Sequence, residues 1–397
     1  MSGQRIHFLY LNIGHFLDHL FVLIFATAAA LTLANEWGLP YGELVPYATP
    51  GFVAFGIFTI PAGWLADKWS REGMIVIFFI GIGIASILAG FAESPVEMAV
   101  YLTLVGALAA IYHPVGLALV VHGRRHTGVP LAINGIFGNM GVASAALVTG
   151  FLIDTVGWRQ AFIVPGILSI LVGLAYLVFL HHHKFARKES EPSHPTAAAS
   201  GYARNLLIRT FAIVLVTTGI GGIVFQSTTF ALPKVFEERL GDLAQSATAV
   251  GGFAFLVFTV AAFAQLAVGW LVDRFPIRRI FAIVAAIQAV FLLAMSQLSG
   301  LAALLVSLGF MLAVFGQIPI NDVLVGRIAK SEWRARAYAL RYIVTFSVMA
   351  STIPLIGWIH GQWGFGILFP LLAMVAGLIF TVVLFMPSNL DAAIQRT

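Results

Sequence analysis

The chain has 397 residues, of which 60% are hydrophobic and only 10% are charged, and its formal net charge is +5. Soluble domains carry roughly 25% charged residues, so this composition excludes an ordinary soluble protein and indicates a chain that lies in a lipid bilayer. Cysteine is absent, which excludes disulfides, thiolate metal sites and cysteine nucleophiles. The basic residues lie in short loops between apolar segments, as membrane topology requires, so no nucleic-acid partner is expected.

Twelve segments are long and apolar enough to cross a membrane as helices, which takes about 20 apolar residues each. The first is too long for a cleavable signal peptide and lacks a small-residue cleavage site, so none is expected. The fold class expected is therefore an all-α membrane protein with twelve transmembrane helices. The expected spans, bounded by charged residues, Gly or Pro, are 7–33, 43–66, 73–92, 95–121, 129–154, 159–181, 206–232, 244–272, 279–297, 300–326, 335–360 and 365–386.

One long polar interval divides the chain. Residues 182–205 contain basic side chains, two prolines and an Ala-Ala-Ala-Ser-Gly stretch, a composition that cannot bury a core, so we expect a cytoplasmic linker. The linker separates an N-terminal six-helix bundle (1–181) from a C-terminal one (206–397). The adjacent run His181-His182-His183 would suit a metal, but a solvated charge cluster beside the membrane is the favoured interpretation. We therefore expect no metal site and no cofactor.

The distribution of basic residues predicts the orientation. Of the 22 Lys and Arg residues, 18 lie at the termini or in even-numbered loops, three lie in odd-numbered loops, and Arg341 lies within a span. Basic residues favour the cytoplasmic side, so both termini are expected there, in the inner membrane of a bacterium. The same asymmetry supports an even number of helices.

Each half of the chain carries a version of one loop motif. Residues 63–72 (GWLADKWSRE) recur as 269–279 (GWLVDRFPIRR), and prolines 114 and 319 lie at equivalent depths of the fourth and tenth spans. The repetition predicts two pseudo-symmetric six-helix bundles. Two such parallel repeats with a site between them near the bilayer midplane are a known plan of secondary transporters.

These residues resemble the major facilitator superfamily over essentially the whole chain. The loop 63–71 fits the pattern Gly-x-Leu-Ala-Asp-(Arg/Lys)-x-x-(Arg/Lys), and 157–162 (GWRQAF) resembles a segment common in bacterial members. Within the superfamily, His113-Pro114 and the His15/His19 face look most like the fosmidomycin-resistance-type efflux branch. One departure concerns coupling: drug exporters of the superfamily often carry an arginine where this fourth span carries His113.

The first span places several ionisable side chains together. At about 100° per residue, Asn12, His15 and His19 share one helix face and Asp18 flanks it. Ionisable groups inside the hydrocarbon are costly and normally face the bundle interior. Burial favours a neutral carboxyl group and a nearby imidazolium favours a charged one, so we expect Asp18 to carry a proton, with His15, His19 and His113 adjusting its affinity. The alternative is that each histidine bonds a backbone carbonyl and joins two helices.

Polar residues of other spans are candidates for substrate binding. Arg341 either points inward, where it would grip an anion bidentately, or extends to the cytoplasmic headgroups. A pair of Arg341 with Asp18 or Asp322, broken by substrate, is a possible coupling switch. Glycines of the fifth span favour close helix packing. The substrate candidates are Asn12, Asn134, Asn139, Gln226, Gln317, Asn321, Asp322, Arg341 and Tyr342.

The repeated loops suggest a gate at the inner mouth. The resemblance implies that an acid at the end of each preceding helix faces the positive N-terminus of a helix in the other half, while arginines bond nearby carbonyls or acids. Positive-inside topology explains the arginines but not an aspartate in each half. The gating candidates are Gly63, Asp67, Arg71, Gly269, Asp273 and Arg278.

The expected function is secondary active transport of a small organic solute by alternating access, coupled to protons. Efflux by antiport is the first choice, and symport uptake of an anionic metabolite or siderophore is the alternative. A monomer in the lipid bilayer is expected. A lipid-modifying enzyme or a sensor without transport activity are alternatives of another class, but no Ser/His/Asp or His-x-x-x-Glu arrangement at a membrane face supports an enzyme.

Overall fold

The computed structural model describes residues 3–124, 127–183, 204–328 and 331–387, apart from the side chains of 204–207, 326–328, 331–340 and 342. Within these ranges all regular elements are helices, and twelve segments are long and apolar enough to cross a membrane, which confirms the predicted fold class. The segments are Gly3–Glu36, Tyr41–Lys68, Arg71–Gly90, Pro95–Val121, Gly128–Val156, Trp158–His182, Ile208–Arg239, Ala247–Arg274, Ile277–Ala294, Gly300–Val325, Ile343–Trp363 and Phe365–Leu384.

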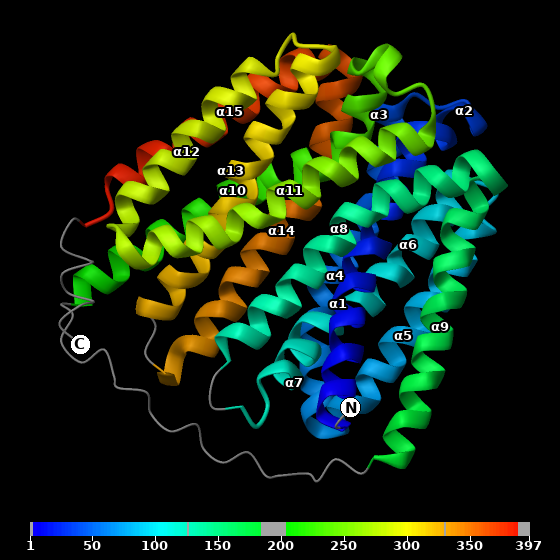
Figure 1. Cartoon of the computed structure of the whole chain (residues 1–397), viewed down its shortest axis with the longest axis horizontal. Coiled ribbons are helices and arrows are strands. Elements are labelled where there is room, and N and C mark those ends of the chain that lie inside the picture. Colours follow the sequence, from blue (N-terminus) through cyan, green and yellow to red (C-terminus); the bar gives the residue numbers. More distant parts are fainter. Residues whose placement is uncertain (1–2, 125–126, 184–203, 329–330, 388–397) are drawn as a thin grey trace. The chain divides into compact units, whose positions relative to one another are not determined.

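The helices follow the sequence signals closely (Figure 1). Ser70 caps the helix that begins at Arg71, because its hydroxyl accepts a 3.0 Å hydrogen bond from the Gly73 amide. The α-helices have the bounds α1 (Gly3–Ala28), α2 (Ala34–Glu36), α3 (Tyr41–Leu44), α4 (Thr49–Lys68), α5 (Arg71–Gly90), α6 (Pro95–Ala109), α7 (Leu117–Val121), α8 (Gly128–Val156), α9 (Trp158–His182), α10 (Arg204–Arg239), α11 (Ala247–Arg274), α12 (Ile277–Ala294), α13 (Gly300–Ile328), α14 (Ser331–Trp363) and α15 (Phe365–Leu384).

Two spans contain π-helical turns. α1 passes through the turn η1 (Ala29–Leu33) into α2, and α6 is followed by the turn η3 (Tyr112–Gly116), which leads into α7. Pro114 lies inside η3, and proline has no N–H to donate and clashes with the carbonyl four residues earlier. The fourth span is therefore interrupted at its His-Pro pair, and π turns of this kind are frequent at functional sites.

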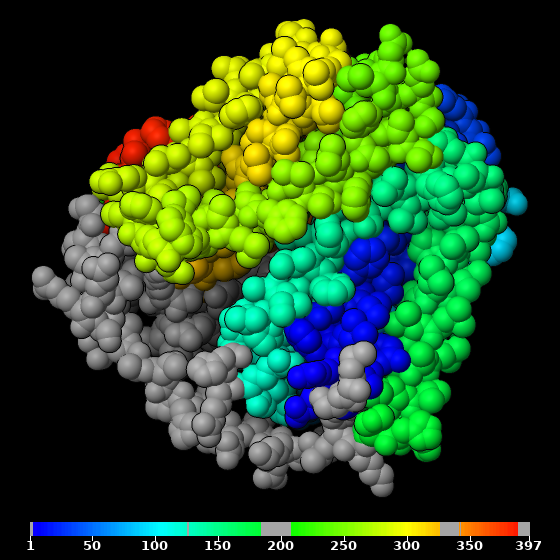
Figure 2. Space-filling view, in the orientation of Figure 1, coloured from blue at the N-terminus to red at the C-terminus, as the bar shows by residue number. Residues whose placement is uncertain are grey.

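The chain packs as two compact units. The first contains Met1–Ala186 with Thr229–Thr259 and Ile353–Gln362, and the second contains Arg187–Thr228, Val260–Thr352 and Trp363–Thr397. In the first unit α1 packs on α8, α5 packs on α9, and α4 packs on α6. Figure 2 shows α1 in blue between α8 and α9 on this face. The bundles 1–181 and 206–397 stay predictions, and most of the linker 182–205 lies outside the described residues.

Glycines bring the paired helices of the first unit into backbone contact. A Cβ atom on Gly83 of α5 would lie 2.5 Å from the carbonyl oxygen of Gly166 of α9, and one on Gly166 would lie 2.7 Å from that of Gly83. A side chain on Gly141 of α8 would collide with the backbone oxygen of Phe16 of α1. Small residues at membrane interfaces permit this close approach, so the predicted packing role fits Gly141.

The second unit has an aliphatic and aromatic core formed by α12, α13 and α15, with contributions from α10 and α11. Phe281, Ile320 and Ile379 are fully buried members of this core. At its edge, Arg209 and Arg278 donate to the last carbonyl groups of α15, at 2.7 Å each, to Phe385 and Leu384 respectively. The two arginines satisfy backbone acceptors that the helix itself leaves unpaired.

Replacing Gly141 by alanine is expected to lower the stability of the protein by roughly 1–3 kcal/mol, because the added methyl group forces α1 and α8 apart. Unfolding in detergent, followed by tryptophan fluorescence, measures the difference. Gly135→Ala on the same helix is the matched control, since a Cβ there meets no atom within 4 Å. Equal stabilities of the two variants would show that the contact between α1 and α8 does not need a glycine.

Candidate functional site

α1 carries a buried polar stripe through an otherwise apolar helix. Asn12 is 3% exposed, His15 is 7% exposed and Asp18 is 0% exposed, while His19 is partly buried. Their spacing on one side of α1 turns them toward α8 and the interrupted fourth span, which both pack on α1. The predicted grouping of these side chains agrees with the geometry.

The interruption in the fourth span supplies the partner of Asp18. Nε2 of His113 in η3 lies 3.3 Å from Oδ2 of Asp18. His113 is partly buried, and its side chain is 13% exposed. A carboxyl group in a membrane interior needs a partner or a proton, and the His113 imidazole can be that partner or exchange a proton with it.

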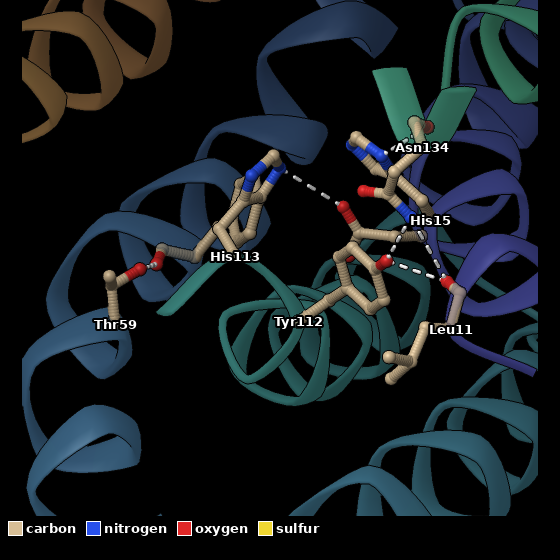
Figure 3. A network of polar contacts seen from close by, with 8 residues as sticks. Leu11, His15, Thr59, Tyr112, His113 and Asn134 are labelled. Atoms are coloured by element: carbon tan, nitrogen blue, oxygen red, sulfur yellow. Dashed lines mark hydrogen bonds and ion pairs between the residues drawn. The ribbon is translucent and has the colours of Figure 1, made fainter. Parts of the chain in front are cut away.

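A hydrogen-bond network fixes the site on the α1 side (Figure 3). The Tyr112 hydroxyl donates to the Leu11 carbonyl at 2.6 Å. Nδ2 of Asn134, on α8, donates to the Tyr112 hydroxyl and to Oδ1 of Asn12, both at 2.9 Å. Three elements, α1, η3 and α8, are therefore joined by buried polar contacts. Asn134 and Asn12, predicted as substrate contacts, bond each other in this structure.

The hydrogen bond of His15 defines the tautomer of its ring. Nδ1 of His15 lies 2.8 Å from the backbone oxygen of Asn134. A carbonyl oxygen can only accept, so Nδ1 carries the hydrogen, and a neutral His15 has its lone pair on Nε2. The His15 ring stacks on Tyr112 at 4.9 Å with an interplanar angle of 21°. Gly138 leaves room for the ring, since a Cβ there would lie 2.7 Å from His15 Nε2.

His15, His19 and His113 lie close together. Their ring centres are 5.0, 5.4 and 5.5 Å apart, and one potential ligand atom from each lies within 4.8 Å of the other two. Together with Asp18 they make a cluster of four titratable groups, which we call the His/Asp cluster. Such a cluster can hold and transfer protons, and its donor atoms are of the kind that bind divalent metals.

An apolar hollow adjoins the His/Asp cluster. It is lined by side chains of α1, η2 (Val45–Ala48), α4 and α6, among them Phe25, Phe52 and Phe55. The Phe55 ring centre is 5.8 Å from that of His113. The cluster is thus bordered by aromatic surface on the α4 side.

The second unit holds a separate polar group. Arg341 of α14 is 9% exposed and bonds the carboxylate of Asp322 on α13. Asn321 is 3.5 Å from the Thr217 hydroxyl, and Gln317 packs on Gly221 of α10. The predicted Asp322 to Arg341 pair is thus formed.

Other substrate candidates are not joined to these groups by any described contact. Gln226 is 1% exposed on α10, and Asn139 is partly buried on α8. The side chain of Tyr342 lies outside the described residues. Their roles stay predictions.

The first gating loop contains an internal ion pair. Arg71 bonds Asp67 at 2.8 Å, four residues earlier, across the turn between α4 and α5. Gly63 faces Pro114 of η3, to which a Cβ would be 3.4 Å distant, whereas Gly269 faces open space. In the second loop, Arg278 donates to the Leu384 carbonyl, a contact of the kind predicted for these arginines. Asp273 is the last residue but one of α11. The gating roles stay predictions.

Sequence reasoning missed two polar features. Tyr112 joins η3 to α1 and α8, and its signal was a hydroxyl-bearing residue beside His113 in an apolar span. Asp154, at the end of α8, accepts bonds from the amides of Ala247 and Thr248 at 3.2 and 2.7 Å, and from the Thr248 hydroxyl at 2.6 Å. Asp154 lies two residues before the C-terminal end of α8, and the helix that it caps, α11, begins about ninety residues later.

Known proteins resemble this chain in sequence and in fold. The sequence profile of the Major Facilitator Superfamily matches residues 11–259. A gallate transporter of Pseudomonas putida is 24% identical over 308 residues, which cover 70% of this chain and 68% of the relative. A 4-hydroxybenzoate transporter of the same organism is 22% identical over 303 residues, covering 68% and 67%.

Solved structures share the fold at low sequence identity. A bacterial homolog of the human lysosomal transporter Spinster, in its inward-facing occupied conformation, has a TM-score of 0.76 at 15% identity and covers 100% of this chain and 98% of its own. A D-xylose-proton symporter has a TM-score of 0.73 at 14% identity, covering 96% and 98%. Together with the twelve apolar helices, the profile shows that this chain is an integral membrane protein and belongs to the Major Facilitator Superfamily.

Proposed function

We propose that the chain is a secondary active transporter that moves a small organic acid by alternating access, coupled to protons at the His/Asp cluster. The observation that carries this proposal is Asp18, a fully buried carboxyl group on the first helix of a chain of this family, 3.3 Å from His113. Alternating access by movement of the two halves around a central site is what membership of the family implies. An enzyme or a sensor has no comparable support in the site.

The proton is the coupling ion that the cluster suits best. Asp18 has only an imidazole as its described charge partner, and an isolated buried carboxylate is costly. Proton uptake removes that cost, and proton release becomes favourable when water reaches the group or when His113 takes the proton. His113 also occupies the region where drug exporters of the superfamily carry an arginine, so we propose that it replaces that residue.

An organic acid is the substrate class that the relatives favour. They are named for gallate, 4-hydroxybenzoate and sulfoacetate, all of which are anions near neutral pH. Arg341 is a buried guanidinium that can bind a carboxylate bidentately in exchange for Asp322. We therefore propose the anion alternative as the substrate class, with uptake by symport as the direction.

Efflux by antiport is the second candidate, and the His113-Pro114 resemblance to the fosmidomycin-resistance-type branch favours it. The direction of the proton gradient that drives accumulation in vesicles decides between the two.

We further propose a monomer in a bacterial inner membrane with both termini in the cytoplasm, because 18 of the 22 basic residues lie in the loops that this topology places inside.

Asp18→Asn is expected to abolish accumulation of radiolabelled 4-hydroxybenzoate in proteoliposomes under an imposed pH gradient, because the amide cannot carry the proton. Exchange of internal for external substrate is expected to continue, since exchange requires no net proton movement. The control is Asp242→Asn, which removes an exposed carboxyl group. Gradient-driven accumulation by Asp18→Asn at the wild-type rate would contradict the coupling proposal.

Arg341→Ala is expected to weaken binding of 4-hydroxybenzoate by roughly 10- to 100-fold, because hydrogen bonds to charged groups contribute about 1.5–3 kcal/mol. Asp322→Asn is expected to strengthen binding, since the substrate no longer competes with a carboxylate for the guanidinium. Titration of purified protein with labelled ligand measures both. Arg274→Ala is the control, because that guanidinium lies 4.1 Å over the Trp270 ring. Unchanged affinity in Arg341→Ala would remove the anion proposal and leave the coupling proposal standing.

A further inference from the structure

We propose that the His/Asp cluster is also a binding site for one divalent transition-metal ion of the Zn²⁺ kind, with His15, His19 and His113 as ligands and Asp18 as the compensating charge. The three imidazoles come from α1 and from η3, which begins about ninety residues later. The fold brings one potential ligand atom of each within 4.8 Å of the other two.

The first argument is the geometry of the rings. Three imidazoles bound to one tetrahedral ion through bonds of about 2.0–2.1 Å place their ring centres about 5 Å apart. The observed separations of 5.0, 5.4 and 5.5 Å match that arrangement. The potential ligand atoms lie within 4.8 Å of one another, so adjustments of the side-chain torsions bring all three onto one ion.

The second argument is the orientation of His15. Its Nδ1 donates to the backbone oxygen of Asn134 at 2.8 Å. Metal-binding histidines almost always donate their other N–H to a carbonyl or carboxylate, which fixes the tautomer. Nε2 of His15 is left buried with its lone pair and without a hydrogen-bond partner in the described structure. This is the arrangement of a metal ligand, and it costs free energy if nothing binds there.

The third argument is charge and donor type. Oδ2 of Asp18 lies 3.3 Å from Nε2 of His113, about the edge of a tetrahedron with bonds of 2.0–2.1 Å. A buried carboxylate offsets part of the ion's charge, either as a fourth ligand or as the acceptor behind His113. Imidazole nitrogen suits Zn²⁺, Ni²⁺, Co²⁺ and Cu²⁺, whereas the oxygen-poor ligand set does not suit Mg²⁺ or Ca²⁺.

The metal ion and the proton would compete for the same atoms, since imidazole binds metal only in its neutral form. This consequence rests on the proposed function, under which the cluster carries the coupling proton. Metal occupancy would then hold the cluster in one charge state and stop coupled transport.

Titration of the full-length protein with CoCl₂ and ZnCl₂ tests the site. The protein is purified in detergent without a polyhistidine tag and treated with chelator. We expect one Co²⁺ per chain with the visible absorption of a tetrahedral site, displaced by one equivalent of Zn²⁺, and a zinc X-ray absorption spectrum showing three imidazole ligands. No stoichiometric binding, or a spectrum with fewer than three imidazoles, would overturn the proposal.

Variants assign the ligands. His15→Gln, His19→Gln and His113→Gln are each expected to weaken Zn²⁺ binding by roughly 10- to 100-fold or more, as long as each variant elutes as a single species in size-exclusion chromatography. His7→Gln is the matched control, because His7 lies on the same helix and bonds Tyr176 at 2.8 Å instead. A second control, combined replacement of His181, His182 and His183 by alanine, removes the surface histidines. Affinity that drops in the controls, or persists in all three ligand variants, would overturn the assignment.

Transport measurements with Zn²⁺ distinguish a failure of the metal site from a failure of the proposed function. Zn²⁺ at saturating concentration is expected to block gradient-driven accumulation in wild-type proteoliposomes, and an excess of chelator is expected to restore it. Stoichiometric binding without inhibition would support the metal site and contradict coupling at the cluster. Inhibition of the wild type by Zn²⁺, with no stoichiometrically bound ion, would contradict the metal site alone.

Discussion

The contact between Asp18 and His113 is the constraint on which the rest of the first unit depends. A carboxyl group that is 0% exposed within a membrane span requires a partner of suitable charge and geometry. That partner comes from the fourth span, so α1 and η3 must lie side by side. The backbone must also be interrupted where His113 is presented, and Pro114 supplies the interruption.

The polar network around this contact requires a close approach of α1 and α8, and the glycines of α8 permit it. Asn134 bonds Asn12 and Tyr112 only because α8 approaches α1 closely, and Gly141 permits that approach. Gly138, one helical turn earlier, makes room for the His15 ring. Packing and chemistry therefore depend on the same helix pair, and the cluster is held by backbone contacts as well as by hydrogen bonds.

Much of the architecture was predictable from sequence because membrane spans obey a simple length rule. The span 95–121 was predicted with both ends as observed, and 365–386 ends two residues beyond the observed segment. The grouping of His15 and Asp18 with His113 also followed, since few ionisable residues occur in the spans and each must avoid lipid. The repeated loop motif predicted two pseudo-symmetric bundles, and the family resemblance predicted a transporter.

What the sequence could not predict depended on contacts between distant segments. Asn134 was expected to contact substrate, yet it bonds Asn12 and Tyr112, which only the crossing of α1 and α8 determines. The cap that Asp154 provides for α11 has the same origin. The proposed metal site was not expected, since His15, His19 and His113 were interpreted as groups that adjust the proton affinity of Asp18. The acceptor of the His15 N–H, which sets the direction of its lone pair, is a backbone atom that no residue pattern encodes.

The turn η3 has a consequence for how this part of the protein can vary. A π turn holds one residue more than the α turn it replaces, so it amounts to a one-residue insertion in a helix. Within η3 two consecutive side chains, Tyr112 and His113, both contact α1, at the Leu11 carbonyl and at Asp18 respectively. A related chain shortened by one residue here would keep a continuous span and the register of everything after it. It would nonetheless present different side chains of this turn to α1, so the number of residues between Ala109 and Leu117 bears on whether both contacts can form.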